Sequence, residues 1–367
     1  MVSKTETEER KLDHIRMCLT KDVQAKSIKA GFEDIHLVHK ALPEINRNQV
    51  STLKEIFGHK LAAPLIIGAM TGGAKTTAKI NAVLAEAVEK LGLGMGVGSQ
   101  RAALEDPKLA YTFQITREKA PTALLIANIG CPQLISGYGV REAEEAVKMI
   151  KANALAIHLN PLQEAIQAEG QTDFMGGLDK IGEIAHALPV PIIAKETGAG
   201  MSTEVAVALD EVGVRGIDLG GAGGTSWAAV EYHRAKKFRD ELRQRLGLTF
   251  WDWGIPTSIS LIEVRNSTKL TVIATGGVRT GIDIVKALAL GADAVGIALP
   301  LLKSALKSPA KIEKELTHLI AELKTAMFLI GAKSIQDLDR VPVVITGKTA
   351  DWLKARGFKL EEYARRG

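Results

Sequence analysis

The chain has 367 residues, of which 46% are hydrophobic and 4% aromatic, and its formal net charge is +5. A large core can be buried, and the 35 glycines suit many tight turns better than a β-sandwich. The positive excess is small and dispersed, no basic-aromatic stripe is present and no apolar run is long enough to span a membrane, so neither nucleic acid nor membrane is expected as a partner.

Residues 1–32 form a charged lead-in with helical spacing. A helix would place Arg10 and His14 on one face, next to Lys11; the alternative is a solvated charged tail. No signal-peptide pattern is visible here. The two cysteines, Cys18 and Cys131, favour reduced thiols, although a buried pair stays open. We therefore expect a cytoplasmic protein.

Short strands are expected at 33–39 and 53–57, where they close the bottom of a barrel or form a hairpin before it. Eight apolar segments follow, each leading into a helix. The strands are predicted at 64–69, 94–98, 123–127, 154–157, 191–194, 216–219, 271–274 and 293–297, and the main helices at 74–91, 106–119, 140–151, 178–187, 203–212, 226–245, 257–266 and 281–290. This alternation predicts an α/β fold, a parallel (β/α)₈ TIM barrel. We expect a single domain with an N-terminal extension (1–60), a barrel core (61–306) and short C-terminal helices (307–367).

Glycines alternate at 92, 94, 96 and 98 with a period of two. No helix starts within this run, which argues against a dinucleotide-binding fingerprint. The pattern favours a strand with one face left bare, to which a flat ring could come close.

Polar side chains follow the predicted strands at the ends that share one rim of a barrel. A lone Ser or Asn in such a place is commonly a helix cap, but caps do not require Arg, His or Lys. The set therefore predicts a site at this rim; its members are Thr71, Ser99, Arg101, Asn128, His158, Asn160, Lys195, Thr225 and Arg279.

The last two strand–helix units carry a candidate phosphate site. Thr275 is followed by Gly276, Gly277, Val278 and Arg279, and the next strand ends at Ala298-Leu299. Residues without a Cβ expose backbone N–H groups to an anion, and barrels commonly hold phosphates at these loops. The alternative is an ordinary glycine turn with a solvated Arg.

The segment from His158 to Glu164 is the densest polar cluster. A lone Glu164 could share Mg²⁺ with substrate phosphates, because that ion commonly binds through one or two carboxylates plus phosphates. Glu164 could instead be an ordinary acid in the first turn of a helix.

Two further positions are candidates for the chemistry. Lys195 ends an apolar strand and could form a Schiff base or face an electron-rich ring, or it could simply pair with Glu196 or Glu164. Trp227 and Glu231 share a helix face, where they could supply a cavity wall and a proton acceptor; the alternative is a packed Trp with a solvated Glu.

Taken in order, these motifs resemble those of the type 2 isopentenyl diphosphate isomerases, FMN-dependent barrel enzymes of isoprenoid synthesis, over nearly the whole chain. The motifs are Arg10-Lys11-x-x-His14, Gly68-Ala69-Met70-Thr71-Gly72-Gly73, Gly96-Val97-Gly98-Ser99-Gln100-Arg101, His158-Leu159-Asn160-Pro161-x-Gln163-Glu164, Gly223-Gly224-Thr225-Ser226-Trp227 and Gly276-Gly277.

The resemblance implies roles for individual residues. Flavin contacts are implied for Ala69, Met70, Thr71, Ser99, Asn128, Lys195, Thr225, Gly276, Gly277, Val278, Arg279, Ala298 and Leu299. Substrate contacts are implied for Arg10, Lys11, Ser99, Gln100, Arg101, His158, Asn160, Gln163 and Trp227, and a Mg²⁺ contact for Glu164. The residues implied in catalysis are Gln163, Glu231, His158 and Lys195.

The implied reaction interconverts isopentenyl and dimethylallyl diphosphate by a 1,3-proton shift over reduced FMN, with NADPH as the reductant. The family also implies a homotetramer or homo-octamer. One rival is an FMN-dependent oxidoreductase of the 2-hydroxy-acid oxidase type on the same barrel. Such an enzyme needs a His base and an Arg clamp for a carboxylate in its later strands, and strands six to eight offer no His. The other rival is a barrel that stores or senses a phosphorylated ligand.

Overall fold

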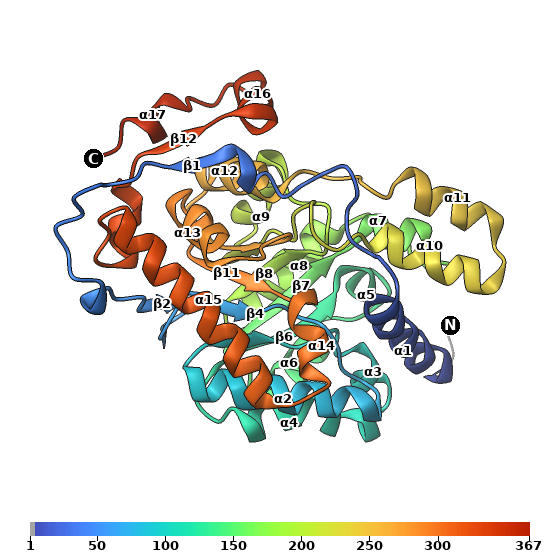
Figure 1. Cartoon of the computed structure of the whole chain (residues 1–367). Coiled ribbons are helices and arrows are strands. Elements are labelled where there is room, and N and C mark those ends of the chain that lie inside the picture. The colour runs from blue at the N-terminus through green and yellow to red at the C-terminus, as the bar shows by residue number, and fades with distance from the viewer. Residues whose placement is uncertain (1–3) are drawn as a thin grey trace.

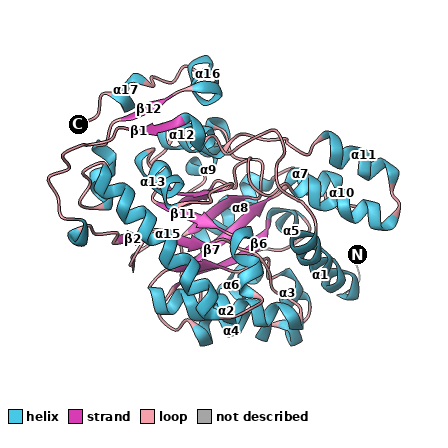
Figure 2. Cartoon of the chain, viewed as in Figure 1, coloured by secondary structure: helices cyan, strands magenta, loops and turns pink. Residues whose placement is uncertain are grey.

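The computed structural model describes residues 4–367, with side chains from Arg10 onward. Eight parallel strands close into a barrel in the order β10-β11-β4-β5-β6-β7-β8-β9, and helices surround it (Figures 1 and 2). The pairing of Val295 with Leu65 closes the ring. The fold class is confirmed. The strands are β4 (Leu65–Ile67), β5 (Gly94–Gly96), β6 (Leu124–Gly130), β7 (Ala154–Leu159), β8 (Ile192–Glu196), β9 (Gly216–Asp218), β10 (Thr271–Thr275) and β11 (Ala294–Ile297).

The helices around the barrel bury apolar stripes against the strands. In α2, for example, Ile80, Leu84 and Val88 recur every four residues and are buried. The surrounding helices are α2 (Lys75–Leu91), α3 (Arg101–Glu105), α4 (Tyr111–Lys119), α5 (Cys131–Ile135), α6 (Val140–Ile150), α7 (Pro161–Ile166), α8 (Gly177–Ala187), α9 (Thr203–Glu211), α10 (Trp227–Phe238), α11 (Glu241–Thr249), α12 (Thr257–Ser267), α13 (Gly281–Ala289), α14 (Leu299–Ala305) and α15 (Pro309–Leu329).

The long helix predicted at 226–245 is wrong, because two helices occupy this stretch. Helix α10 ends at Arg239, which adopts a left-handed conformation (φ 59°). Asp240 then caps α11 by accepting a hydrogen bond from the Arg243 amide at 3.0 Å. Helices α10 and α11 form a hairpin that extends away from the barrel in Figure 1.

The two short strands predicted before the barrel have different partners. Strand β2 (Lys54–Ile56) forms a hairpin with β3 (His59–Leu61), and Ile56 packs with Ile66 and Ile273 of the barrel. Strand β1 (Ile35–Leu37) instead pairs antiparallel with β12 (Val343–Ile345) near the other end of the chain. Both expected locations for 33–39 are therefore wrong, because its partner lies too far along the sequence for local patterns to reveal.

The N-terminal segment runs across the rim that holds the carboxyl ends of the strands. Helix α1 (Lys4–Thr20) contacts α3, α10 and α14. Residues 21–32, here called the strap, continue over the loops after β9 and β10. The amide of Ala25 donates to Gly224 O, and the amide of Ser258 donates to Ala30 O, each at 2.9 Å.

The C-terminal segment packs on the outside of the barrel. It comprises η4 (Ile335–Arg340), β12, α16 (Gly347–Ala355) and α17 (Glu361–Ala364). Buried Glu263 of α12 holds it through Trp352 Nε1 at 3.0 Å and Arg356 Nη2 at 3.2 Å. Within residues 4–367, no helix combines the length and apolar character needed to cross a bilayer. The division of the chain at residues 60 and 306 stays a prediction.

Candidate active site

A cavity of about 290 Å³ opens at the carboxyl ends of the barrel strands. It brings together residues from all eight strand ends and from α1, as the barrel geometry predicts. The predicted site residues that line it are Arg10, Lys11, Ala69, Met70, Thr71, Ser99, Arg101, Asn128, His158, Asn160, Gln163, Glu164, Lys195, Thr225, Trp227, Gly276, Gly277, Val278, Arg279, Ala298 and Leu299. Gln100 and Glu231 are the two predicted site residues outside this lining.

The loop after β10 forms a cradle that has no room for side chains. Gly276 and Gly277 have φ of 107° and 74°, which favour glycine. A Cβ on Gly277 would lie 2.6 Å from Ala30 Cβ, and one on Gly224 would collide with the Gly277 amide. Burial lowers the pKa of Arg279, whose guanidinium donates to Gln24 Oε1 of the strap at 3.1 Å. This cradle fits an anionic group held by backbone amides.

Lys195 is fixed by a partner that the sequence analysis missed. Its Nζ lies 2.7 Å from Oδ2 of Asp218, so the alternative of a carboxylate pair with Glu196 or Glu164 is wrong. The other carboxylate oxygen of Asp218 accepts a hydrogen bond from the Thr275 hydroxyl. Both members of the ion pair are largely buried, so the ammonium is held in one place.

His158 is neutral at physiological pH. Burial lowers its pKa to about 4, and the nearby charge of Lys195 contributes to that shift. Its Nδ1 donates to Asn128 Oδ1 at 2.8 Å. A neutral ring whose Nδ1 carries the proton leaves Nε2 as an acceptor.

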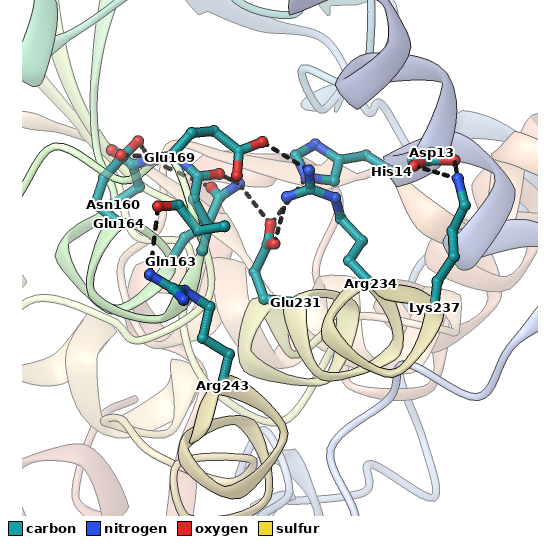
Figure 3. Close-up of polar contacts among 12 residues, drawn as sticks. Asp13, His14, Asn160, Gln163, Glu164, Glu169, Glu231, Arg234, Lys237 and Arg243 are labelled. Carbon is teal, nitrogen blue, oxygen red and sulfur yellow. Dashed lines mark hydrogen bonds and ion pairs between the residues drawn. The ribbon is translucent and has the colours of Figure 1, made fainter. Parts of the chain in front are cut away.

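Glu164 lies at the first turn of α7 inside a network of amides. Its carboxylate accepts a hydrogen bond from Asn160 Nδ2 at 2.8 Å (Figure 3). It also accepts hydrogen bonds from Gln167 Nε2 (2.9 Å) and the Gln171 amide (2.7 Å). Asn160 Oδ1 is buried and has no hydrogen-bond partner within the described chain. No group of three or more His, Cys, Asp or Glu side chains within residues 4–367 could hold a metal, so an ion at Glu164 needs ligands from a bound molecule.

Glu231 lies behind the cavity wall and is only 2% exposed. It is therefore not a solvated carboxylate, and it does not reach the cavity to accept a proton directly. Its carboxylate contacts His14 Nε2 at 2.8 Å, Arg234 Nη1 at 2.6 Å and Gln163 Nε2 at 3.5 Å (Figure 3). Burial alone would raise the pKa of Glu231, but His14 and Arg234 bring it below its ordinary value. Glu231 therefore reaches the cavity through His14 and Gln163.

The Glu231 cluster also connects to the loop after α7. Arg234 Nη2 lies 2.6 Å from Glu169 Oε1, so one guanidinium bridges two carboxylates. The His14 ring meets Trp227 edge-on with centroids 5.1 Å apart. Helix α1 is thus fastened to α10 by both charge and packing.

Three cations gather on one side of the cavity. Lys11 Nζ donates to the carbonyls of Gly72 and Ser99, each at 2.8 Å. Burial, together with the charge of Arg10, lowers the pKa of Lys11 to about 7. Arg101 Nε pairs with Glu105 at 2.7 Å. Arg10 and Lys11 line the cavity, so the solvated-tail interpretation is wrong for them, and the cluster suits a polyanion.

Gln100 is fully buried and faces away from the cavity, so the expected substrate contact is wrong. Its side chain donates to Ala146 O at 2.8 Å and accepts from the Asn128 amide at 2.9 Å. The bare-face interpretation of the alternating glycines does not hold at Gly98, where a Cβ would lie 2.7 Å from the Thr71 backbone, whereas a Cβ on Gly96 would make only an ordinary contact with Ala69 at 3.6 Å. Gly98 therefore lets the segment at Thr71 approach the end of β5 closely.

Several cavity residues were not assigned a role from the sequence. The spacing of His14 from Arg10 was a usable signal, and so was the charge of Asp218 inside an apolar strand. For Gln133 and Gln167 no local signal exists. The unassigned lining residues with polar side chains include His14, Gln133, Gln167, Thr197 and Thr275.

Known proteins match the chain over almost its full length. The FMN-dependent dehydrogenase family matches residues 3–134 and 141–344. The isopentenyl-diphosphate delta-isomerase of Methanosarcina barkeri is 50% identical over 98% of this chain and 97% of its own length. That of Archaeoglobus fulgidus is 49% identical over 96% and 99%. Among solved structures, a lactate oxidase from Pediococcus acidilactici has a TM-score of 0.64 at 17% identity, covering 95% of each chain, which shows a shared fold. The resemblance drawn from the motifs is thus confirmed, and the chain belongs to the FMN-dependent dehydrogenase family and, within it, to the isopentenyl-diphosphate delta-isomerases.

Proposed function

We propose that this chain interconverts isopentenyl and dimethylallyl diphosphate, with FMN as its cofactor. The observation that carries the proposal is one cavity that combines a glycine cradle with a cluster of cations. In the ring of eight strands, β7, which leads to Glu164, lies opposite β11, which leads to Leu299. Two phosphorylated molecules can therefore be held from different sides of one rim.

The residues of the cradle fit the phosphate of FMN. Backbone amides at Gly276, Gly277 and Val278 would hold it, with Arg279 and the turn at Ala298 beside them. The ring would contact the residues implied by the family motifs, among them Met70, Asn128, Lys195 and Thr225. When bound and reduced, FMN supplies a flat, electron-rich face with an exchangeable proton.

The diphosphate would bind where the cations gather. Arg10, Lys11 and Arg101 would contact its oxygens, and Glu164 would share a Mg²⁺ ion with it. Neutral His158 offers a polar contact without adding charge. Asn160 Oδ1 is a buried acceptor in need of a partner, which a hydrated cation would supply.

The hydrocarbon end would lie against Trp227 and Gln163. The reaction moves a proton from C2 to C4, and protonation of the alkene produces a tertiary cation that water would capture. Helix α1, which contributes Arg10, Lys11 and His14 to the lining, would limit the entry of water. Ionised Glu231 would hold Gln163 and His14 in the orientation that proton movement requires.

The proposal is tested by incubating purified protein with FMN, Mg²⁺, NADPH and carbon-13-labelled isopentenyl diphosphate, followed by NMR. We expect conversion to an equilibrium mixture with far less than one NADPH consumed per turnover. NADPH consumption equal to the amount of product formed would support a flavin oxidoreductase instead. Binding without conversion would overturn the enzymatic proposal.

Lys11 predicts the pH dependence of substrate capture. Its pKa is lowered to about 7, so the ammonium is present below this pH and lost above it. We expect kcat/KM, which reports the free enzyme, to fall above pH ~7. The bound diphosphate favours the ammonium, so kcat should change less. Lys11→Met should lower kcat/KM at pH 6 and remove this limb; a limb that persists in the variant would assign it to another group.

Glu164→Gln should raise the Mg²⁺ concentration that supports half-maximal activity by at least about tenfold, because a neutral amide binds Mg²⁺ far less well than a carboxylate. Glu144→Gln is the control, because Glu144 is a partly exposed carboxylate of α6 that pairs with Lys148 and does not line the cavity. Titration of metal-stripped enzyme with MgCl₂ measures the effect. Equal Mg²⁺ dependence in the wild type and Glu164→Gln would exclude Glu164 as a ligand.

The proposal includes a cytoplasmic homotetramer or homo-octamer. The free thiols Cys18 and Cys131 agree with a reducing compartment. Large apolar side chains on the α10–α11 hairpin and just after it are exposed to solvent in one chain, which supports burial against another copy. Light scattering of the purified protein measures the subunit number. The exposed residues are Phe238 (63%), Leu242 (66%), Leu248 (52%) and Trp253 (61%).

A further inference from the structure

Asp218 is a buried carboxylate with no role in the proposed proton shift. It ends β9 and lies in register with Lys195 of β8 on one side and Ile273 of β10 on the other. One oxygen receives the Lys195 ammonium at 2.7 Å and the other receives the Thr275 hydroxyl. Asp218 is 7% exposed, so this arrangement is screened little by solvent.

The Thr275 contact ties the ion pair to the glycine cradle. Thr275 immediately precedes Gly276, and its Oγ1 accepts a hydrogen bond from the Gly220 amide at 2.8 Å. Thr275 O accepts one from the Gly221 amide at 2.8 Å. A single carboxylate therefore fixes both a cation in the cavity wall and the strand that leads to the phosphate cradle.

The charge of Lys195 matters beyond its hydrogen bond. An uncompensated ammonium in a buried wall strongly favours negative charge on a bound neighbour. Reduced FMN is more electron-rich than oxidised FMN and can carry a negative charge on its ring. A carboxylate 2.7 Å from the ammonium cancels most of that attraction.

We propose that Asp218 is a positioning residue that fixes the Lys195 ammonium in the cavity wall and limits how strongly it stabilises negative charge on reduced FMN. This inference rests on the proposed function, because it takes FMN to occupy the cavity lined by Lys195. It gives Asp218 an effect on the relative stability of reduced and oxidised FMN, and no contact with the diphosphate.

The test is the midpoint potential of FMN bound to the Asp218→Asn variant, measured by dye-coupled titration at pH 6 and compared with the wild type. Asn keeps an oxygen for Lys195 but removes the negative charge. At pH 6 we expect the preference for reduced over oxidised FMN to rise about tenfold, which is ~30 mV for a two-electron couple. The reduced-flavin absorption spectrum should also change toward the anionic form. An unchanged potential and spectrum at pH 6 would overturn the inference.

Asp293→Asn is the matched control. Asp293 is also an ion-paired Asp, 2.5 Å from Arg265 Nη2, but it precedes β11 at the opposite end of the barrel. Its loss changes the net charge equally and should leave the potential unchanged. An equal shift in both variants would assign the effect to net charge and refute a role for Asp218.

A second arm asks whether Asp218 acts through Lys195. Lys195→Met removes the ammonium and should shift the potential in the opposite direction, toward oxidised FMN; a potential that does not fall would overturn the inference. If Asp218→Asn does not fold, Thr275→Val provides a second variant, because it removes the hydroxyl that holds Asp218. It should shift the potential in the same direction as Asp218→Asn by a smaller amount. An unchanged potential in Thr275→Val would contradict the inference. Wild-type protein that fails to bind FMN would instead overturn the proposed function.

Discussion

Glu231→Gln is expected to lower kcat about 10²-fold while FMN stays bound. This is the loss that misplaced reacting groups typically cause, and here the carboxylate orients two cavity residues, His14 and Gln163. The amide keeps the shape but loses the charge that holds the His14 ring and Arg234. Steady-state kinetics at saturating substrate, with the visible flavin spectrum recorded in parallel, measure both effects.

Glu263→Gln separates catalysis from stability. Glu263 is as buried as Glu231, at 1% against 2%, and is likewise held by an arginine, but it lies in α12 under the C-terminal segment. Both variants should lose ~1.5–3 kcal/mol of unfolding free energy, the usual range for a hydrogen bond to a charged group. Only Glu231→Gln should lose kcat. Equal kcat in the two variants would leave Glu231 with a structural role alone.

Gly277→Ala is expected to raise the dissociation constant for FMN about 100-fold, which corresponds to ~2.7 kcal/mol. At φ 74° a Cβ conflicts with the backbone, and it would also lie 2.6 Å from Ala30 Cβ of the strap. The apoprotein relieves both conflicts by moving the loop, so FMN must restore the loop when it binds. Quenching of FMN fluorescence on titration with apoprotein measures the loss.

Gly357→Ala is the control for the backbone conflict. Its φ is 85°, but a Cβ there meets no atom within 4 Å, and it lies in the C-terminal segment. We expect a small loss of stability and unchanged FMN affinity. If Gly277→Ala binds FMN as tightly as Gly357→Ala does, the loop after β10 is not the phosphate cradle.

The sequence alone revealed the barrel because its strands are apolar on both faces and recur with helices between them. The rim residues followed from that, since any polar side chain just after a strand must face the same end. Partners across the barrel could not be found in this way. Asp218 pairs with Lys195 through the register of β8 and β9, and Arg234 bridges Glu231 and Glu169, which only the packed structure brings together.

Two errors have one physical origin. The family resemblance implies a substrate contact for Gln100 along with its neighbours Ser99 and Arg101, but the short helix α3 begins there and turns the Gln100 side chain toward α6. Glu231 shares a helix face with Trp227, yet the ring alone lines the cavity and the carboxylate lies behind it. The spacing of residues along a helix predicts which face they share. How deeply each side chain is buried depends on the element that packs against that face, which here is α1.

The pairing of β1 with β12 has a consequence for biosynthesis. A ribosome releases the first strand of this small sheet long before it makes the second, so Ile35–Leu37 must wait unpaired while the barrel is assembled. Residues 21–32 contact Gly224, Ser258 and Arg279, which are all made earlier, so the strap can settle over the cofactor loops before β12 exists. Nascent chains stalled before residue 343 should therefore bind FMN while Ile35–Leu37 is still accessible to a protease.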